Sequence, residues 1–119
     1  MSQTVYIETT IVSYLTAWPS RDLIRAAHQQ STKEWWKIRR PLFELYCSQL
    51  VEIEASAGDP EAAKDRLVVV QQLPILGITD AALEIGAALL SEMALPSVAN
   101  SDAQHVGIAA VHGINYLLT

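Results

Sequence analysis

Residues 4–10 read Thr-Val-Tyr-Ile-Glu-Thr-Thr, a short β-rich run that ends on an acid and is followed by two hydroxyl residues. Its β-branched and aromatic side chains predict a strand over residues 4–8, and the two Thr residues can cap a following helix. Similar short apolar runs recur at residues 42–47, 73–78 and 115–119. Short apolar strands that alternate with helices are typical of an α/β protein with a mostly parallel sheet covered on both faces.

Capping and breaking residues set the expected helix boundaries. Residues 21–40 contain neither Gly nor Pro before Pro41, and Asp59-Pro60 is a strong start signal. Pro74 and Gly77 suit residues 73–78 to an edge strand. Side chains at the other helix starts offer caps: Ser48, Thr79 or Asp80, and Asn100 or Ser101. The expected helices after the first therefore cover residues 21–40, 48–57, 60–70, 79–93 and 100–113.

Length and composition limit the class of protein. A chain of 119 residues with 50% hydrophobic and 18% charged residues is expected to form one globular domain, residues 1–119. The longest uninterrupted apolar run is four residues, which excludes a transmembrane helix, and the start of the chain does not resemble a signal peptide. The single Cys47 excludes an intrachain disulfide and a cysteine-based zinc site. We therefore expect a cytoplasmic protein.

The charge is unevenly distributed. Residues 21–40 hold six of the eight basic residues and two acids, a net charge of +4, whereas the rest of the chain carries −9. The total of −5 argues against a simple basic nucleic-acid coat protein. One face is expected to attract a polyanion, and another is expected to hold cations.

Three acids occupy positions that suit a shared site. Glu8 ends the first strand, Glu54 lies in the helix after the second, and Asp102 lies at the start of the last helix. Ligands of parallel sheets bind beyond the carboxyl ends of the strands, where the three carboxylates would repel one another without a cation. Oxygen ligands without Cys favour Mg²⁺ or Mn²⁺. Each acid also has a plainer interpretation, since Asp102 is suited to capping and Glu54 or the nearby Glu52 can face solvent.

Four motifs, in order along nearly the whole chain, resemble the PIN domain and, more narrowly, the VapC-like toxins of type II toxin–antitoxin pairs. They are Val5-Tyr6-Ile7-Glu8-Thr9-Thr10, Ser48-Gln-Leu-Val with Glu54, Gly58-Asp59-Pro60 with Arg66-Leu67, and Asp102-Ala103-Gln104-His105 with the stretch up to Tyr116-Leu-Leu-Thr119. The resemblance implies a small three-layer α/β/α ribonuclease whose clustered acids hold Mg²⁺ or Mn²⁺. It carries the catalytic and metal-binding roles onto Glu8, Glu54 and Asp102.

The resemblance also sets expectations for activity and partners. It implies a metal-dependent endoribonuclease that cleaves single-stranded RNA, binds an antitoxin protein and forms a homodimer. The first acid of the family is usually Asp, and here it is Glu8. The family chain continues past the last strand through a loop that often supplies a fourth polar ligand, so a C-terminally truncated domain without that ligand is expected here. The alternative function is therefore a catalytically weak or inactive interaction module with the same fold.

The basic helix is a second candidate functional element. Lys33, Lys37 and Arg40 share a face, and of the adjacent rings Trp35 is expected to pack inward and Trp36 to lie nearer the surface. A basic stripe with an exposed ring suits RNA, through phosphate contacts and base stacking. The same features suit a subunit interface. The expected RNA contacts are Lys33, Trp36, Lys37 and Arg40.

Two further residues are candidates for a supporting role around the acids. His105 follows Asp102 by three positions and so lies on the same side of the helix, where it is either packed or placed to support the site. Thr9 is suited to capping or to a contact behind the metal ligands. A third functional class, phosphotransfer or phosphatase chemistry, needs a strand-one Asp and usually a downstream Lys. Glu8 stands at that position, and no Lys follows Lys64.

Overall fold

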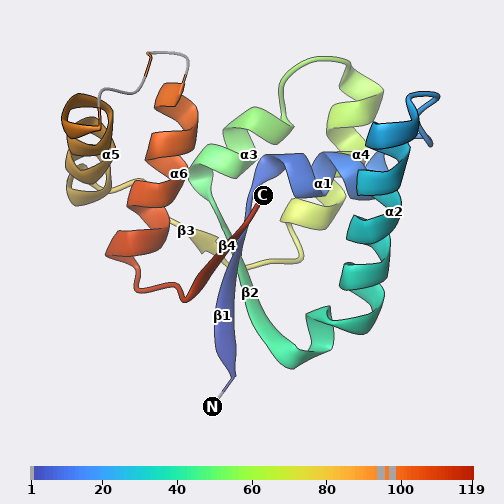
Figure 1. Ribbon diagram of the computed structural model, residues 1–119, viewed down its shortest axis with the longest axis horizontal. Helices are drawn as coiled ribbons and strands as arrows, with labels where there is room; N and C mark the ends of the chain where they lie inside the picture. Colours follow the sequence, from blue (N-terminus) through green and yellow to red (C-terminus); the bar gives the residue numbers. More distant parts are fainter. Residues whose placement is uncertain (1, 94–95, 97–98) are drawn as a thin grey trace.

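Strands and helices alternate along the chain in a computed structural model, which describes residues 2–93, 96 and 99–119 (Figure 1). The elements in chain order are β1 (Gln3–Ile7), α1 (Thr9–Thr16), α2 (Leu23–Ile38), the short 3₁₀ helix η1 (Arg40–Leu42), β2 (Phe43–Ser48), α3 (Gln49–Ala55), α4 (Pro60–Val70), β3 (Ile75–Leu76), α5 (Asp80–Glu92), α6 (Asn100–Val111) and β4 (Tyr116–Leu118).

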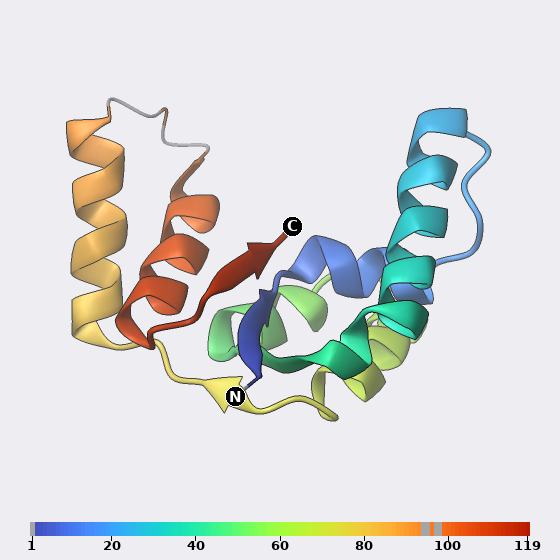
Figure 2. The same cartoon turned by 60° about the horizontal axis from the view of Figure 1, so that its bottom comes forward.

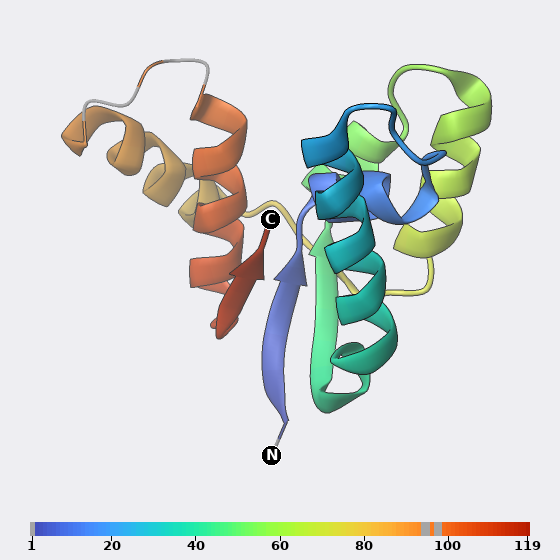
Figure 3. The ribbon, with the colours of Figure 1, turned by 45° about the vertical axis from the view of Figure 1, so that its right-hand side comes forward.

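The strands form a parallel sheet in the order β3-β2-β1-β4. The connections from β1 to β2 and from β2 to β3 each add a strand on the same side of β1. The connection from β3 to β4 runs in the opposite direction and places β4 on the other side of β1. Right-handed crossovers then place α1–α4 on one face and α5–α6 on the other. Figure 3 shows the strands between these two helical groups. The predicted α/β class and parallel sheet are confirmed, and the arrangement is compatible with three α/β/α layers.

Three predicted helix caps are confirmed at the level of individual hydrogen bonds. The side chains of Ser48, Asp59 and Thr79 accept hydrogen bonds from backbone N–H groups in the first turns of α3, α4 and α5. These bonds satisfy donors that a helix leaves without partners at its N-terminus. The edge position of β3 is also confirmed, although the strand is only two residues long.

Two predicted caps are wrong. The residue before α1 is Glu8, whose side chain makes no capping bond, so Thr9 lies inside the helix. The residue before α6 is Ala99, and neither Asn100 nor Ser101 precedes the helix. The hydroxyls of Thr9 and Ser101 instead donate to a carboxylate elsewhere in the fold. At both positions the hydroxyl donates to a distant carboxylate and, among the described residues, does not accept from a backbone N–H of its own helix.

The two helical groups are packed differently. Between α5 and α6, a Cβ atom added at Gly107 would lie 2.3 Å from the carbonyl oxygen of Ala82, so the two backbones touch. Figure 2 shows this pair at one end of the molecule and the long α2 at the other. On the opposite face of the sheet, apolar side chains fill the space, and the fully buried ones include Val12, Val51 and Val70.

Arg66 joins the end of α3 to α4. Its Nε donates to the carbonyl of Ala55 at 3.0 Å, and an Nη donates to the carbonyl of Ala57 at 2.6 Å. Gly58 follows with a φ of +83°, a value that glycine adopts without the penalty other residues meet. The guanidinium thus satisfies carbonyls that the short α3 leaves free at its C-terminus.

None of the helices in the described part of the chain is long and apolar enough to cross a bilayer.

Candidate functional site

The site lies where the direction of the sheet connections reverses, between β1 and β4. Glu8 directly follows β1, and Thr119 directly follows β4. The backbone N–H of Glu8 donates to the carbonyl of Leu118 at 3.1 Å, and the hydroxyl of Thr119 donates to Glu8 Oε2 at 2.6 Å. In open α/β sheets, ligands bind beyond the carboxyl ends of the strands at this kind of reversal. The topology therefore puts Glu8 where a ligand is expected.

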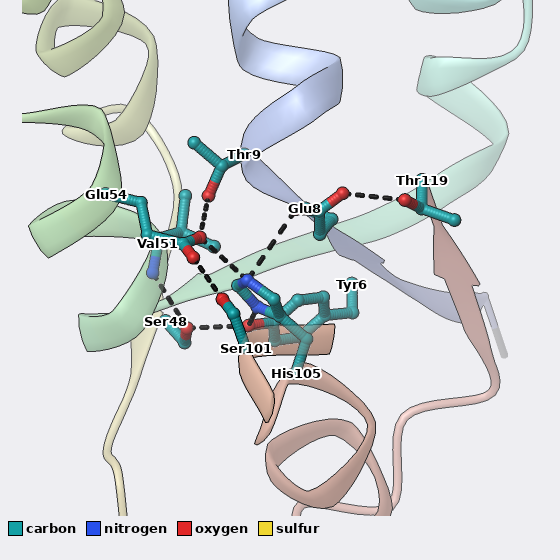
Figure 4. Close-up of polar contacts among 9 residues, drawn as sticks. All are labelled: Tyr6, Glu8, Thr9, Ser48, Val51, Glu54, Ser101, His105 and Thr119. Atoms are coloured by element: carbon teal, nitrogen blue, oxygen red, sulfur yellow. Dashed lines mark hydrogen bonds and ion pairs between the residues drawn. The ribbon is translucent and has the colours of Figure 1, made fainter. Parts of the chain in front are cut away.

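Three side chains from separate elements meet at this rim. Glu8 is 7% exposed, Glu54 extends from α3, and His105 extends from α6 (Figure 4). One ligand atom from each of the three lies within 4.8 Å of the others, and His105 Nε2 is 3.6 Å from Glu8 Oε1. The predicted meeting of Glu8 and Glu54 is therefore present in the structure.

Glu54 is the most heavily hydrogen-bonded member of the site. Thr9 Oγ1 and His105 Nε2 lie 2.5 Å and 2.7 Å from its Oε1, and the hydroxyl of Ser101 donates to its Oε2. Partial burial raises the pKa of Glu54, but the hydrogen bonds from Ser101 and Thr9 and the proximity of His105 outweigh it and lower the pKa below its ordinary value. The site is thus built for an ionised Glu54.

His105 is held from its other side by a buried chain of hydroxyls. Its Nδ1 lies 2.6 Å from the hydroxyl of Tyr6, which lies 2.7 Å from Ser48 Oγ. All three side chains are almost completely buried. Burial is also the main reason why the pKa of Tyr6 is raised well above its ordinary value, so the phenol keeps its proton. Both ring nitrogens of His105 therefore have defined partners.

A cavity of about 480 Å³ opens beside the two glutamates. It runs along α1 and reaches Arg25 and Gln29 of α2. No carboxylate of the described residues lies within 4.0 Å of the Arg25 guanidinium. The cavity therefore combines paired carboxylates with a cationic side chain that no acid neutralises, a combination suited to a phosphate ligand with a cation.

A second cavity of about 370 Å³ adjoins the first and shares Thr10 and Tyr14 with it. Its lining includes His28 and Trp35, and the Tyr14 and His28 rings lie 6.2 Å apart, centroid to centroid. Aromatic side chains next to a cavity with a cationic side chain can stack the bases of a single-stranded nucleic acid.

Asp102 differs from the other two predicted acids. Its side chain is exposed in the first turn of α6, and it does not belong to the group formed by Glu8, Glu54 and His105. Its neighbour Ser101 is the residue that contacts Glu54. The structure therefore brings together two of the three predicted acids and places the imidazole of His105 in the third position.

The four predicted RNA contacts lie in the C-terminal half of α2 and in η1. Lys37 is exposed and Lys33 is partly buried. Trp36 is also partly buried, and the Arg40 guanidinium covers its ring at 4.7 Å from the centroid. None of these four lines the cavity at the glutamates, which α2 reaches through Arg25.

Four polar residues of the site were not predicted: Tyr6, Ser48 as a partner of Tyr6, Ser101 and Thr119. A Tyr in the middle of a short apolar strand is a signal, because a buried phenol needs a hydrogen-bond partner. The cap role of Ser48 was visible, but its second contact joins residues 42 positions apart. Ser101 was predicted only as a possible helix cap. Thr119 belongs with this group, since its hydroxyl holds Glu8.

Glu8, Glu54 and His105 form a group of side chains that could hold a metal ion. Glu8 and Glu54 offer carboxylate oxygens at the rim. Among the described residues, no Lys or Arg side chain forms an ion pair with either of them. Glu8 Oε1 also receives no hydrogen bond there, since Thr119 donates to Oε2. Carboxylate oxygens with room for water are the ligands that Mg²⁺ and Mn²⁺ prefer.

Comparison with known proteins adds no assignment to this geometry. No protein-family model matches the chain. No curated protein matches it either.

Proposed function

We propose that this chain is a PIN-like, metal-dependent endoribonuclease that cleaves single-stranded RNA. The observation that supports the proposal most is the pairing of Glu8 and Glu54, two residues 46 positions apart in the sequence. Their side chains meet at the reversal of the sheet connections, beside a cavity that Arg25 also lines. In this role Glu8 and Glu54 hold Mg²⁺ or Mn²⁺. The proposal also includes Asp102, which is exposed on the first turn of α6 and lies outside the group formed by Glu8, Glu54 and His105, as a weaker contributor to the same site.

Each part of the site has a task in phosphodiester hydrolysis. A bound divalent cation supplies Lewis-acid activation of water and neutralises charge that develops on the phosphate. Thr9 and Ser101 keep Glu54 oriented and ionised through their hydroxyls. Arg25 holds a phosphate of the substrate, and the cavity lined by Tyr14, His28 and Trp35 receives a neighbouring base. Exposed Lys37 extends the attraction for the RNA backbone along α2.

Cleavage assays with matched variants test this function. The purified chain with Mn²⁺ should cut a labelled single-stranded RNA, and Glu8→Gln and Glu54→Gln should each reduce the rate at least about a hundredfold, because each removes a negative charge from the cation site. Asp102→Asn should reduce the rate less, because Asp102 lies outside the group formed by Glu8, Glu54 and His105. Glu84→Gln, at an exposed position of α5, is the control and should cut like the wild type. A wild-type chain that is inactive with both Mn²⁺ and Mg²⁺, or a fully active Glu54→Gln chain, contradicts the proposal.

A non-catalytic interaction module is the second candidate function. The side chains of Trp18, Leu23 and Ile24 are 91%, 85% and 72% exposed and occupy the connection between α1 and α2 and the start of α2. Exposed apolar side chains that lie close in sequence mark protein-binding surfaces. This surface suits an antitoxin or a second copy of the chain. Titration calorimetry separates the two functions, because absence of binding at millimolar Mn²⁺ favours the module and excludes the nuclease.

A further inference from the structure

The buried residues beneath Glu54 form a continuous chain of hydrogen bonds. The backbone N–H of Val51 donates to Ser48 Oγ at 3.2 Å, Ser48 Oγ lies 2.7 Å from the Tyr6 hydroxyl, and Tyr6 lies 2.6 Å from His105 Nδ1. His105 Nε2 then lies 2.7 Å from Glu54 Oε1. Figure 4 shows this chain running from Ser48 through Tyr6 and His105 to the carboxylate.

The direction of the chain follows from counting its hydrogens. Ser48 Oγ already accepts from Val51, Tyr6 has one hydroxyl hydrogen, and the ionised Glu54 at the far end can only accept. If Ser48 donates to Tyr6 and Tyr6 donates to His105 Nδ1, the ring hydrogen is on Nε2 and points at Glu54. Every hydrogen in this arrangement has an acceptor.

The opposite direction fails at both ends. With the ring hydrogen on Nδ1, His105 would donate to Tyr6 and Tyr6 would donate to Ser48. The hydroxyl hydrogen of Ser48 would then have no acceptor among the described residues, although the side chain is fully buried. The lone pair of His105 Nε2 would also face the Glu54 carboxylate at 2.7 Å, which places two acceptors against each other. If both ring nitrogens of His105 carried a hydrogen, the hydroxyl hydrogen of Ser48 would again have no acceptor among the described residues.

We propose that His105 is a positioning residue that holds Glu54 through an Nε2–H donor, in a tautomer imposed by Ser48 and Tyr6, and that it is not a metal ligand. Coordination by Nε2 would need that nitrogen to lose its hydrogen and break its bond to Glu54. The direction of the hydrogen bonds stands independently of catalysis, whereas the effect on cation affinity rests on the proposed function.

The tautomer can be measured directly in the intact wild-type chain. In a long-range ¹H–¹⁵N spectrum of metal-free protein, His105 should show a pyrrole-type Nε2 and a pyridine-type Nδ1, and its signals are assigned by their loss in His105→Gln. Addition of Mg²⁺ should leave both nitrogens in these classes. A pyridine-type Nε2 without metal, or conversion of Nε2 to a coordinated nitrogen with Mg²⁺, overturns the proposal.

Variants test the source of the tautomer. Tyr6→Phe removes only the hydroxyl, and it should abolish the single tautomer and weaken Mn²⁺ binding about tenfold, the lower range for a lost partner behind a metal ligand. Tyr46→Phe is the matched control, because Tyr46 pairs with Tyr6 in the neighbouring strand and lies outside the hydrogen-bond chain. Retention of the single tautomer in Tyr6→Phe contradicts the proposed role of Tyr6.

A second pair of variants separates a donor from a ligand. The amide of His105→Gln can accept from Tyr6 and donate to Glu54, so Mn²⁺ affinity should stay within about threefold of wild type, whereas His105→Leu should lose about tenfold or more. Equal losses in both variants would contradict the proposed donor role of His105. If a variant does not fold, as judged by circular dichroism, the wild-type spectrum alone decides. A wild-type chain with the expected tautomer that cuts no RNA would contradict the nuclease and leave this inference intact.

Discussion

The two faces of the sheet are covered by helices that are fixed in opposite ways. In the α5–α6 pair the backbones touch at Gly107, whereas the α1–α4 group is held apart and filled by side chains such as Val12 and Val51. Backbone contact tolerates no added atom, and a filled interior tolerates no removed one. Glu54 accepts hydrogen bonds from both groups, through Thr9 on one side and Ser101 and His105 on the other. The geometry of the site therefore depends on both kinds of packing.

The largest effect is expected from adding one carbon to the α5–α6 contact. Gly107→Ala should lower the free energy of unfolding by about 3 kcal/mol, because the new Cβ would meet the Ala82 carbonyl and force the helices apart. Urea denaturation measures the change. Gly77→Ala is the control, since a Cβ there meets only Gln49 Oε1 at 3.8 Å, and its stability should stay near that of wild type. Equal stability of the two variants would show that the α5–α6 contact is not tight.

Removing atoms from the other face should have the next largest effect. Val12→Ala deletes two methyl groups from a fully buried position of α1, and the lost burial and the cavity together should lower stability by about 2 kcal/mol. The same substitution at Val68, which is 53% exposed on α4, should change stability by less than about 0.5 kcal/mol. Similar losses of stability at both positions would contradict the conclusion that the packing of buried side chains holds α1–α4 together.

A smaller effect is expected at the polar contact that orders the connection before α2. Gln29 is buried, its Oε1 accepts from Ser20 N at 2.8 Å, and its Nε2 donates to the Trp18 carbonyl at 3.2 Å. Gln29→Met should cost about 1 kcal/mol and increase protease cleavage near residues 18–20. The exposed Gln30 provides the control, because Gln30→Met removes only a contact with Glu34. Unchanged cleavage in Gln29→Met would show that the connection is ordered by other contacts.

The smallest effect concerns acid stability. Because the folded-state pKa of Glu54 is below the unfolded value of 4.5, its ionised form stabilises the fold fully above that pH, and the contribution is lost as pH falls through the folded pKa. In metal-free buffer, Glu54→Gln should therefore lose less stability than wild type when the pH is lowered below 4.5. Ser101→Ala, which removes one donor, should give an intermediate slope. Parallel profiles for wild type and Glu54→Gln would exclude this contribution.

The sequence was most informative where the responsible interactions are local. Ser48, Asp59 and Thr79 cap helices through bonds to residues three positions away, so their roles follow from the chain itself. The order of short apolar runs was likewise enough to predict a parallel α/β sheet. Glu8 could be placed because the carboxyl ends of parallel strands share one rim.

The contacts that complete the site could not be derived in the same way. Thr9 and Ser101 have the side chains of helix caps, yet their hydroxyls reach Glu54 across 45 and 47 positions of sequence. Whether a hydroxyl serves its own helix or a distant carboxylate depends on how the helices pack, and that depends on contacts such as the one at Gly107. The exposed position of Asp102 beside a buried His105 also depends on the rotation of α6 against the sheet.

The contact between Arg66 and the end of α3 has a consequence for mutational tolerance. A helix of seven residues, Gln49–Ala55, is too short to persist by itself, and it carries Glu54 one residue before its end. The guanidinium of Arg66 stabilises that last turn through its hydrogen bonds to the carbonyls of Ala55 and Ala57. Replacement of Arg66, which does not line the cavity beside Glu8 and Glu54, would therefore loosen the Glu54 carboxylate.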